Sequence, residues 1–412
     1  MSPTVPSAPR PPVALYIHFP FCISLCPYCD FVVIAGSAAR GPRNRIGQFL
    51  DALLIELELR ADALDATFGP PGPGGRAPLG SVYLGGGTPS LLPPDEVARL
   101  LGRVVERFAL ADDAEITLEA NPGPDERGDP AALRQAGITR ISFGAQSFDD
   151  TELRKLGRRH RARHVVDAVA AARDSGIPSI NIDLLYDIPD TDMATWMRTL
   201  DTALEVAPDH LSLYALSLDD PVAEGLTGPE GDHLVTTKGA RRWRDAVRPG
   251  QDEDRAAGQY HHAVVALEDA GYRGYEISNW ARPGHESRHN LVYWERRPHE
   301  SLGPGAHAFD GRDRRWTAAR LDGYVAALAG TPASLPPGGA ERLDGPSAAI
   351  EGLILGLRLD TGVPLAAAHE PPLADVFGWA LAAELLTVTD GDRVVLTTRG
   401  RLLSNELFSR LV

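Results

Sequence analysis

The segment Val13–Phe31 reads VALYIHFPFCISLCPYCDF and holds all three cysteines of the 412-residue chain. Its first seven residues are mostly apolar and aromatic, as in a strand buried inside a parallel sheet. Cys22, Cys26 and Cys29 follow with the spacing CxxxCxxC. A disulfide framework needs an even and dispersed set of cysteines, so this cluster predicts a metal or iron–sulfur site instead.

Three thiolates can hold three irons of a cubane cluster and leave the fourth iron open. An open position lets a small molecule bind the metal directly, as in catalytic zinc sites that keep one position free. Two alternatives remain at this point. One is a structural zinc site, for which His18 is the nearby candidate for a fourth ligand, and the other is three unrelated buried thiols. The spacing favours the cluster.

The first half of the chain alternates strand-like and helical patterns. Apolar residues recur every three to four positions in segments such as 46–64, 94–108 and 161–176, which predicts helices. The alternation predicts a parallel sheet, either doubly wound or closed into a barrel. The strand-like runs are Val13–Phe19, Ser81–Gly85, Glu115–Ala120, Arg140–Gln146, Ile180–Tyr186 and His210–Leu216. The stretch Gly69–Gly80 is rich in Pro and Gly and predicts a surface loop.

The alternation stops after Leu216. Residues 217–250 are polar and rich in turn formers, without a clear period, and a helix is predicted over 252–270, followed by a strand-like run at 275–280. The Pro- and Gly-rich stretch 330–346 predicts a boundary. Beyond it, helix-like segments at 347–359, 376–386 and 399–411 and a strand pair at 387–397 resemble a small winged-helix unit.

Composition restricts the class of function. The formal charge is −15 and the pI is about 5.3, which argues against a nucleic-acid partner and favours a packing role for the winged-helix-like unit. Hydrophobic residues make up 43% and charged residues 24%, an ordinary globular profile. No apolar run reaches the roughly 18 residues that cross a bilayer, and the first residues lack an apolar signal core. These features predict a cytoplasmic protein without a transmembrane segment.

Further motifs follow the cysteines in order: GGGTPSLL, LEANPG, RISFGAQSFDDTELRKLGRRH, NIDLLYDIP, SLYAL, YEISNWARPGHESRHNLVYW and GPGAH. CxxxCxxC after a first strand is the signature of the radical S-adenosylmethionine (SAM) superfamily. The ordered set resembles the oxygen-independent coproporphyrinogen III oxidase family. This resemblance implies an α/β fold: a partial (β/α)6 TIM-type barrel at 10–220, an α/β extension at 221–335, and a small C-terminal winged-helix-like accessory domain at 345–412.

The resemblance also implies a site. Cys22, Cys26 and Cys29 would hold a [4Fe-4S] cluster, and SAM would bind the open iron through its amino and carboxylate groups. Tyr16 and Tyr28 would frame the cluster loop. The residues implied to bind SAM are Tyr16, Gly86, Gly87, Thr88, Glu119, Gln146, Arg158 and Asp183.

Chemistry supports several of these roles. Gly86 and Gly87 would let the backbone approach the methionine end of SAM. Glu119 would accept hydrogen bonds from the ribose hydroxyls or the amino group, and Arg158 would pair with the carboxylate. Gln146 and Asp183, at the carboxyl ends of strands, would bind the adenosine part, where barrels commonly present ligand groups. Taken singly, each polar residue suits a surface or capping role equally well.

Two departures select a branch of the family. The oxidases proper carry a further cysteine two residues after the third ligand, where this chain has Phe31, as in the heme chaperone branch. HNLVYW at His289–Trp294 resembles the HNxxYW motif of that branch. Imidazole binds heme iron and the aromatic side chains offer flat apolar faces, so His289 is the candidate heme ligand. The alternative is a core histidine beside packed aromatics. His261, His262 and His307 are weaker candidates.

A third departure concerns the adenosine pocket. Asp187 and Asp190 stand where the family has glycine. Two carboxylates there predict added negative charge and a stiffer turn, and therefore weaker SAM binding.

The resemblance implies one function and leaves one alternative. The first is a heme chaperone with a [4Fe-4S] cluster and SAM, which binds heme and transfers it to an unidentified acceptor protein. The alternative is an enzyme, an oxygen-independent coproporphyrinogen III oxidase that decarboxylates propionates in porphyrin biosynthesis by radical SAM chemistry. The cofactor would carry the hard chemistry in that case.

Overall fold

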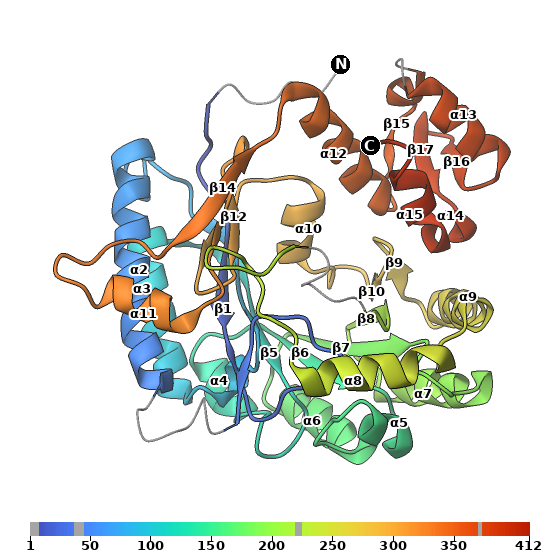
Figure 1. The fold of residues 1–412 in the computed structure, drawn as a ribbon, viewed down its shortest axis with the longest axis horizontal. Helices are drawn as coiled ribbons and strands as arrows, with labels where there is room; N and C mark the ends of the chain where they lie inside the picture. Colours follow the sequence, from blue (N-terminus) through green and yellow to red (C-terminus); the bar gives the residue numbers. More distant parts are fainter. Residues whose placement is uncertain (1–7, 37–44, 219–224, 370–372) are drawn as a thin grey trace.

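Six parallel strands form the centre of the computed structural model, which describes residues 8–36, 45–218, 225–369 and 373–412. They lie side by side in chain order (Figure 1), which confirms the predicted parallel sheet. Their bounds are β1 (Ala14–Phe19), β4 (Leu79–Gly86), β5 (Leu110–Ala120), β6 (Arg140–Gln146), β7 (Ser179–Tyr186) and β8 (His210–Ala215).

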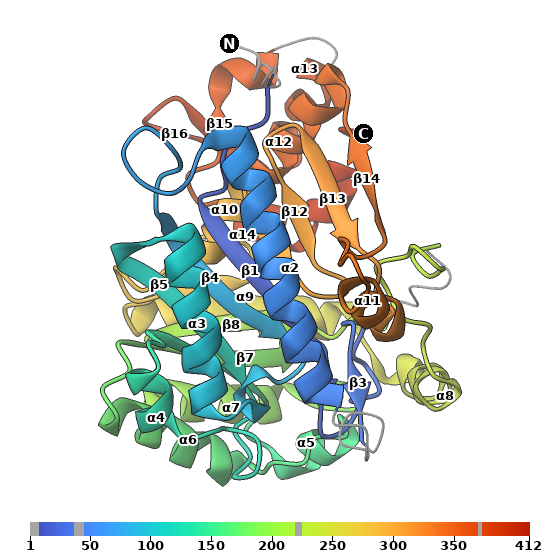
Figure 2. The ribbon, with the colours of Figure 1, turned by 90° about the vertical axis from the view of Figure 1, so that its left-hand side faces the viewer.

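Helices connect successive strands, as right-handed crossover units require. They are α2 (Arg45–Phe68), α3 (Pro94–Phe108), α4 (Pro130–Gln135), α5 (Asp150–Lys155), α6 (Ala162–Asp174) and α7 (Met193–Val206). Figure 2 shows α2 and α3 running along the face of the sheet. Their apolar sides pack against the strands, and the resulting core includes Phe49, Leu53, Val104 and Phe143. Among the described residues, no helix is long and apolar enough to span a bilayer.

Strands from the second half of the chain extend both edges of this sheet. β11 (Glu300–Leu302) pairs in parallel with β1, and β10 (Asn279–Ala281) pairs antiparallel with β8 and β9 (Arg273–Gly274). The sheet stays open at β11 and β9, so it forms a partial barrel. The predicted strand at 275–280 is therefore shorter and begins later. Glu276 instead bridges to Leu359 of the C-terminal part.

A second, antiparallel sheet contains β12 (His307–Phe309), β13 (Asp313–Thr317) and β14 (Gly338–Arg342), with α11 (Leu321–Leu328) between the last two. β14 lies inside the stretch predicted as a Pro- and Gly-rich loop, which corrects that part of the prediction. The glycines suit the position because a Cβ at Gly339 would come within 2.2 Å of the Trp316 ring. A bulkier strand could not pack there.

Part of the segment 217–250 is also regular. Residues 238–247 form helix α8, followed by the short helix η2 (Arg248–Gly250), and residues 219–224 lie outside the described residues. Polar residues hide the pattern, because the side of α8 that packs against the protein combines the apolar Ala240, Trp243 and Val247 with the buried Arg244. The predicted helix at 252–270 is α9 (Glu253–Asp269), and α10 (Arg288–Trp294) carries the HNLVYW motif.

The C-terminal part has its own apolar core, which includes Leu357, Phe377, Val394 and Leu407. It contains three antiparallel strands and short helices, which confirms the winged-helix-like unit. The predicted last helix is two short helices. The elements are α12 (Gly345–Arg358), β15 (Val363–Pro364), η3 (Leu365–His369), α13 (Ala374–Ala382), β16 (Leu386–Thr389), β17 (Arg393–Leu396), α14 (Thr398–Leu402) and α15 (Ser404–Phe408).

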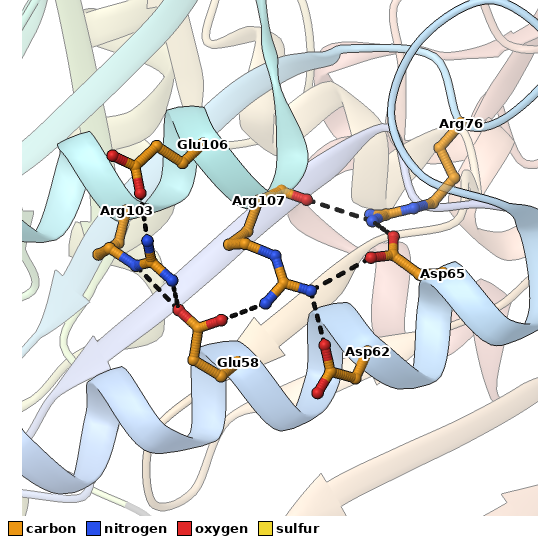
Figure 3. Close-up of polar contacts among 7 residues, drawn as sticks. All are labelled: Glu58, Asp62, Asp65, Arg76, Arg103, Glu106 and Arg107. Carbon is orange, nitrogen blue, oxygen red and sulfur yellow. Dashed lines mark hydrogen bonds and ion pairs between the residues drawn. The ribbon is translucent and has the colours of Figure 1, made fainter.

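An ion-pair network ties α2 to α3 and to the loop that follows α2 (Figure 3). Arg107 of α3 donates to Asp62 at 2.7 Å and to Asp65 at 3.1 Å on α2. Arg76, buried in the loop, pairs with the same Asp65 and donates to the carbonyl of Arg107. The predicted loop 69–80 is thereby fixed at one point on the two helices.

Candidate functional site

The three cysteines line one cavity of about 400 Å³ at the carboxyl ends of the parallel strands. They lie on the cysteine loop, residues 20–33. Short strands close the two ends of this loop, because β2 (Phe21–Cys22) pairs with β3 (Ile34–Ala35). Residues from β4 to β8 complete the wall of the cavity, as expected for a parallel barrel.

Helix α8 holds the cysteine loop in place. The guanidinium of Arg244, itself buried, donates to the carbonyl oxygens of Pro27, Tyr28 and Cys29 at 3.1 to 3.2 Å. The Tyr28 ring packs against an apolar group that includes Leu185, Leu216 and Trp243. Sequence reasoning missed Arg244, because nothing in a polar segment 215 residues away pointed to the loop.

The environment of the thiols keeps them protonated until a metal binds. Burial raises the pKa of Cys22 to about 11 and that of Cys29 to about 12, so the free thiols stay protonated. Iron would displace these protons, because thiol ligands bind metals as thiolates. Two donors already point at sulfur: the Thr88 hydroxyl at 3.3 Å from Cys22 and the Arg158 guanidinium at 3.4 Å from Cys26.

The structure does not offer His18 as a fourth ligand for zinc. His18 does not line the cavity of the three thiols. Its Nε2 bonds the carbonyl of Val32 at 2.8 Å and its Nδ1 bonds the hydroxyl of Tyr16 at 2.9 Å. Burial also lowers the pKa of His18 to about 4. Both ring nitrogens are hydrogen bonded, so His18 supports the cysteine loop and does not bind metal through a free nitrogen.

Glu119 lies at the end of β5 and faces the cavity. It accepts hydrogen bonds from the Tyr83 hydroxyl at 2.7 Å and the Gly86 amide at 2.8 Å. Burial, reinforced by the nearby charge of Asp183, outweighs these bonds and raises the pKa of Glu119 to about 7. A buried carboxylate in this state is stabilised by a cationic amine or by hydroxyl donors, the groups that SAM carries.

Asp183 belongs to a polar network on the inner face of the sheet. It accepts from Asn181 at 2.7 Å and from Ser142 at 3.1 Å, and Asn181 in turn bonds His210 at 2.6 Å. Burial raises the pKa of Asp183. Sequence reasoning missed Ser142, Asn181 and His210, although these polar residues interrupt otherwise apolar strands at positions that face the same side.

Gln146 and Arg158 also line the cavity. Gln146 ends β6 with φ 70°, in the left-handed region, so its side chain leaves the sheet. Arg158 donates to the carbonyl of Gly144 at 2.6 Å and also bonds Asn121, which sequence reasoning missed. The charge of Arg158 remains available beside the thiols for an anionic group.

Gly86 and Gly87 line the cavity, but close packing behind it explains them directly. A Cβ at Gly86, where φ is 104°, would lie 2.3 Å from the His18 ring. A Cβ at Gly87 would lie 2.6 Å from the carbonyl oxygen of Phe21. These glycines therefore let the cysteine loop pack onto β4, apart from any room they leave for a ligand.

The structure places Tyr16 elsewhere. Its ring lines a second cavity, of about 430 Å³, next to the first. The side chains of Asp30 and Phe31 line both cavities. Phe31 is 63% exposed, an unusual position for a phenylalanine, so its ring offers a flat apolar face between them.

His289 is buried and lines neither cavity. Its Nδ1 bonds the Ser81 hydroxyl and its Nε2 bonds the Tyr293 hydroxyl, each at 2.9 Å. Burial lowers its pKa to about 3. Neither ring nitrogen of His289 is open here, and His289 positions Tyr293, which does line the second cavity; its role as the heme ligand stays a prediction.

The two aspartates that replace family glycines lie outside the cavity. Both adopt the left-handed conformation, with φ 55° at Asp187 and 52° at Asp190, which explains the preference for glycine. Asp187 accepts from Arg255 at 2.7 Å, and Asp190 from Lys155 at 3.2 Å. Their charges are paired, so the expected negative charge in the adenosine pocket does not arise.

The side chains of the first cavity therefore fit a [4Fe-4S] cluster and SAM. The cavity presents three thiols for irons, two buried carboxylates for amine or hydroxyl groups, and the guanidinium of Arg158 for a carboxylate. Leu185 and Leu216 add an apolar patch for a base.

Comparison with known proteins agrees with this geometry. The model of the radical SAM superfamily matches residues 16–200. The heme chaperone HemW of Mycobacterium tuberculosis (strain ATCC 25618 / H37Rv) is 37% identical over 412 residues, 100% of this chain and 97% of the relative. The heme chaperone HemW of Escherichia coli (strain K12) is 35% identical over 314 residues, 75% of this chain and 74% of the relative.

A solved structure shares the fold. Coproporphyrinogen III oxidase (HemN) from Escherichia coli, described as a radical SAM enzyme, superposes with a TM-score of 0.78 at 23% identity, over 99% of this chain and 91% of that one. At this identity the likeness concerns the fold alone. The relatives that match along the whole length decide the family: the chain belongs to the heme chaperone HemW family of the radical SAM superfamily.

Proposed function

We propose that this protein is a cytoplasmic heme chaperone that binds heme and transfers it to an acceptor protein. The observation that carries the proposal is the 37% identity to a heme chaperone HemW over the whole chain. Likeness confined to the barrel would leave the cargo open, because many reactions share that fold. Here the likeness includes the extension and the C-terminal unit.

The first cavity is the proposed site of a [4Fe-4S] cluster and SAM. Bound there, these groups would supply one-electron chemistry. Cys22, Cys26 and Cys29 would bind three irons. Glu119 would accept from an amino or hydroxyl group of SAM, and Arg158 would neutralise a carboxylate.

Gln146 and Asp183 would contact the adenosine part, and Thr88, whose hydroxyl donates to Cys22, would stabilise a thiolate. The sheet would limit the access of water to these groups. Tyr16 lines the second cavity and would support the proposed site through its hydrogen bond to His18.

The division of the chain is also part of the proposal. Residues 10–220 would hold the cluster and SAM, 221–335 would contribute the heme-binding motif, and 345–412 would serve as an accessory domain of the kind found with the HemN fold. The acidic surface of the whole chain makes a protein acceptor a better partner than a nucleic acid.

The oxidase alternative can be separated in one experiment. Anaerobically reconstituted protein with SAM and a reductant is given coproporphyrinogen III, and a second sample is titrated with heme. We expect stoichiometric heme binding and no decarboxylated product, with about four irons and four sulfides per chain. Formation of protoporphyrinogen IX would overturn the chaperone proposal, and so would the absence of heme binding.

A further inference from the structure

The second cavity has the lining of a tetrapyrrole site. Its walls come from the cysteine loop, the segment around residue 232, β12, β13 and α12. Phe31, Tyr293 and Phe309 supply aromatic faces, and their combination with a few charged groups is typical of cofactor pockets. Its volume of about 430 Å³ continues into an adjoining hollow of about 750 Å³ that shares Asp232, His307 and Arg314.

A carboxylate in this cavity holds two imidazoles. Asp232 bonds His233 Nδ1 through Oδ1 at 3.0 Å and His307 Nε2 through Oδ2 at 2.8 Å. An anionic carboxylate on one ring nitrogen is the arrangement that orients metal-binding histidines and makes their other nitrogen more basic.

His233 is the better ligand of the two. With Nδ1 on Asp232, its open nitrogen is Nε2, which bonds no other residue in the described part of the chain and can approach iron without interference from the histidine backbone. His307 uses Nε2 for Asp232, and its ring stacks on Trp316 with centroids 6.0 Å apart. This fixes His307 as a support of Asp232.

The other histidines of the region are less suited. Both ring nitrogens of His18 and of His289 are hydrogen bonded. His299 lines the second cavity, but its ring packs edge-on against Tyr293 with centroids 4.8 Å apart, and its Nδ1 bonds the carbonyl of Arg297 at 3.1 Å. His299 therefore fills space between aromatic rings.

Two guanidiniums in the same cavity already bind a carboxylate. Arg296 donates to Glu351 of α12 at 2.5 Å, and Arg314 pairs with the same carboxylate. Heme carries two propionates, and arginine is well matched to carboxylates. The cavity thus offers a nitrogen for iron and aromatic faces for the ring, and a propionate would compete with Glu351 for the two guanidiniums.

We propose that heme binds in this second cavity with Nε2 of His233 as an axial ligand and Asp232 as the residue that positions its imidazole. The inference rests on the proposed heme chaperone function and adds the site and the ligand. It also gives a role to the polar segment 217–250, which supplies Asp232 and His233.

The test uses reconstituted full-length protein titrated with heme, followed by absorption and electron paramagnetic resonance spectra. His233→Ala should weaken heme binding by more than about tenfold and change the iron spectrum. Free imidazole should restore the spectrum of the variant by entering the vacated place. Asp232→Asn should still bind heme, but with about tenfold lower affinity, since the imidazole loses its anionic partner.

Three controls make the result specific. His261→Ala removes an exposed histidine of α9 and should leave heme binding unchanged. Metal-free protoporphyrin IX should bind wild type and His233→Ala equally, because it has no iron to ligate. Iron content and circular dichroism show that the variants are folded, and His233→Gln replaces His233→Ala if the latter is unstable.

The outcomes separate the two proposals. If wild type binds no heme, the proposed function fails. If wild type binds heme and His233→Ala matches it in affinity and spectrum, the function stands and the His233 assignment is wrong. In that case His299→Ala and His289→Ala show which of the rival residues holds the iron.

Discussion

Glu119 shows how the first cavity prepares its side chains for a ligand. The carboxylate lies between β4 and β5, where the Tyr83 hydroxyl and the Gly86 amide donate to it. Burial raises its pKa from about 4.5 to about 7. The protonated form is therefore favoured until a cationic or donating group arrives.

This pKa has a consequence for stability. Between pH 4.5 and 7 the folded protein holds a proton on Glu119 that the unfolded chain releases, so folding stability falls as pH rises through this window. Glu119→Gln mimics the protonated acid, so its folding stability should not fall with pH in this window. Between pH 4.5 and pH 7.5, wild type without SAM should therefore lose about 2 kcal/mol relative to Glu119→Gln, as measured by urea unfolding at each pH.

SAM and an exposed residue provide the controls for this prediction. Saturating SAM should reduce the slope of wild type, because its ammonium group would favour the charged carboxylate. Glu205→Gln, on the exposed side of α7, should track wild type at every pH. If the free energy of unfolding of wild type and of Glu119→Gln changed with pH in parallel, Glu119 would not be buried as described.

Residues near the site differ in how far sequence reasoning could place them. The CxxxCxxC spacing is local, so Cys22, Cys26 and Cys29 were brought together without knowledge of the fold. Tyr16 lies on β1, just before the cysteine loop, yet it lines the second cavity. His289 is bonded by Ser81, which is 208 residues away, and no sequence pattern could indicate this contact.

Helix α8 is the clearest case of an element whose role depends on tertiary contacts. Its sequence is polar, and its buried side is narrow, so it lacks the apolar stripe that identified the other helices. The buried guanidinium of Arg244 replaces that stripe by donating to three carbonyls of the cysteine loop. The six strands, in contrast, carry apolar runs, and each was predicted to within about five residues of its observed bounds.

The contacts of Arg244 predict an effect on the cluster. Arg244→Gln shortens the side chain and leaves buried carbonyls without donors, which costs about 1.5 to 3 kcal/mol per lost bond to a charged group. The cysteine loop should loosen, and a chelator should remove iron at least about tenfold faster than from wild type. The loss of charge-transfer absorbance after chelator addition measures this rate.

The same helix offers a matched control. Arg242 lies two residues earlier and is exposed, so Arg242→Gln changes the charge of α8 equally without touching the loop. It should lose iron at the wild-type rate. Equal rates for Arg244→Gln and Arg242→Gln would show that the apolar contacts of Tyr28, and not the guanidinium, hold the loop.

The network of α2 and α3 illustrates a different kind of support (Figure 3). Most of its pairs are partly exposed and contribute little on their own. Arg76 is the exception, because it is buried and also packs over the Phe108 ring at 5.4 Å. The predicted surface loop 69–80 is thus anchored through one arginine, which composition alone could not distinguish from the other residues of the loop.

At the scale of the whole molecule, the two cavities share a wall. Asp30 and Phe31 follow the third cysteine and line both. Heme in the second cavity would therefore lie beside the loop that holds the cluster, and a change at the cluster would reach the heme through this short segment. The position of Phe31, read from sequence as a mark of the heme chaperone branch, thus gains a structural reason.

The C-terminal unit takes part in the second cavity through one helix. Glu351 and Leu355 of α12 line it, and Glu351 bonds Arg296 and Arg314. Burial opposes the charge of Glu351, but the two arginines outweigh it and lower its pKa. Glu351 therefore holds, within the chain, the carboxylate position that a heme propionate would take. The separate core of this unit was predicted from sequence, whereas this contact was not.

Removal of this internal carboxylate predicts tighter porphyrin binding. Glu351→Gln frees the charge of Arg296 and Arg314 for the propionates, so metal-free protoporphyrin IX should bind about fivefold more tightly, or about 1 kcal/mol. Its dimethyl ester, which lacks carboxylates, should bind wild type and variant equally. Glu341→Gln, which removes a more exposed partner of Arg314, should change affinity less than about twofold. Weaker binding of protoporphyrin IX to Glu351→Gln would mean that α12 shapes the cavity and does not compete with its ligand.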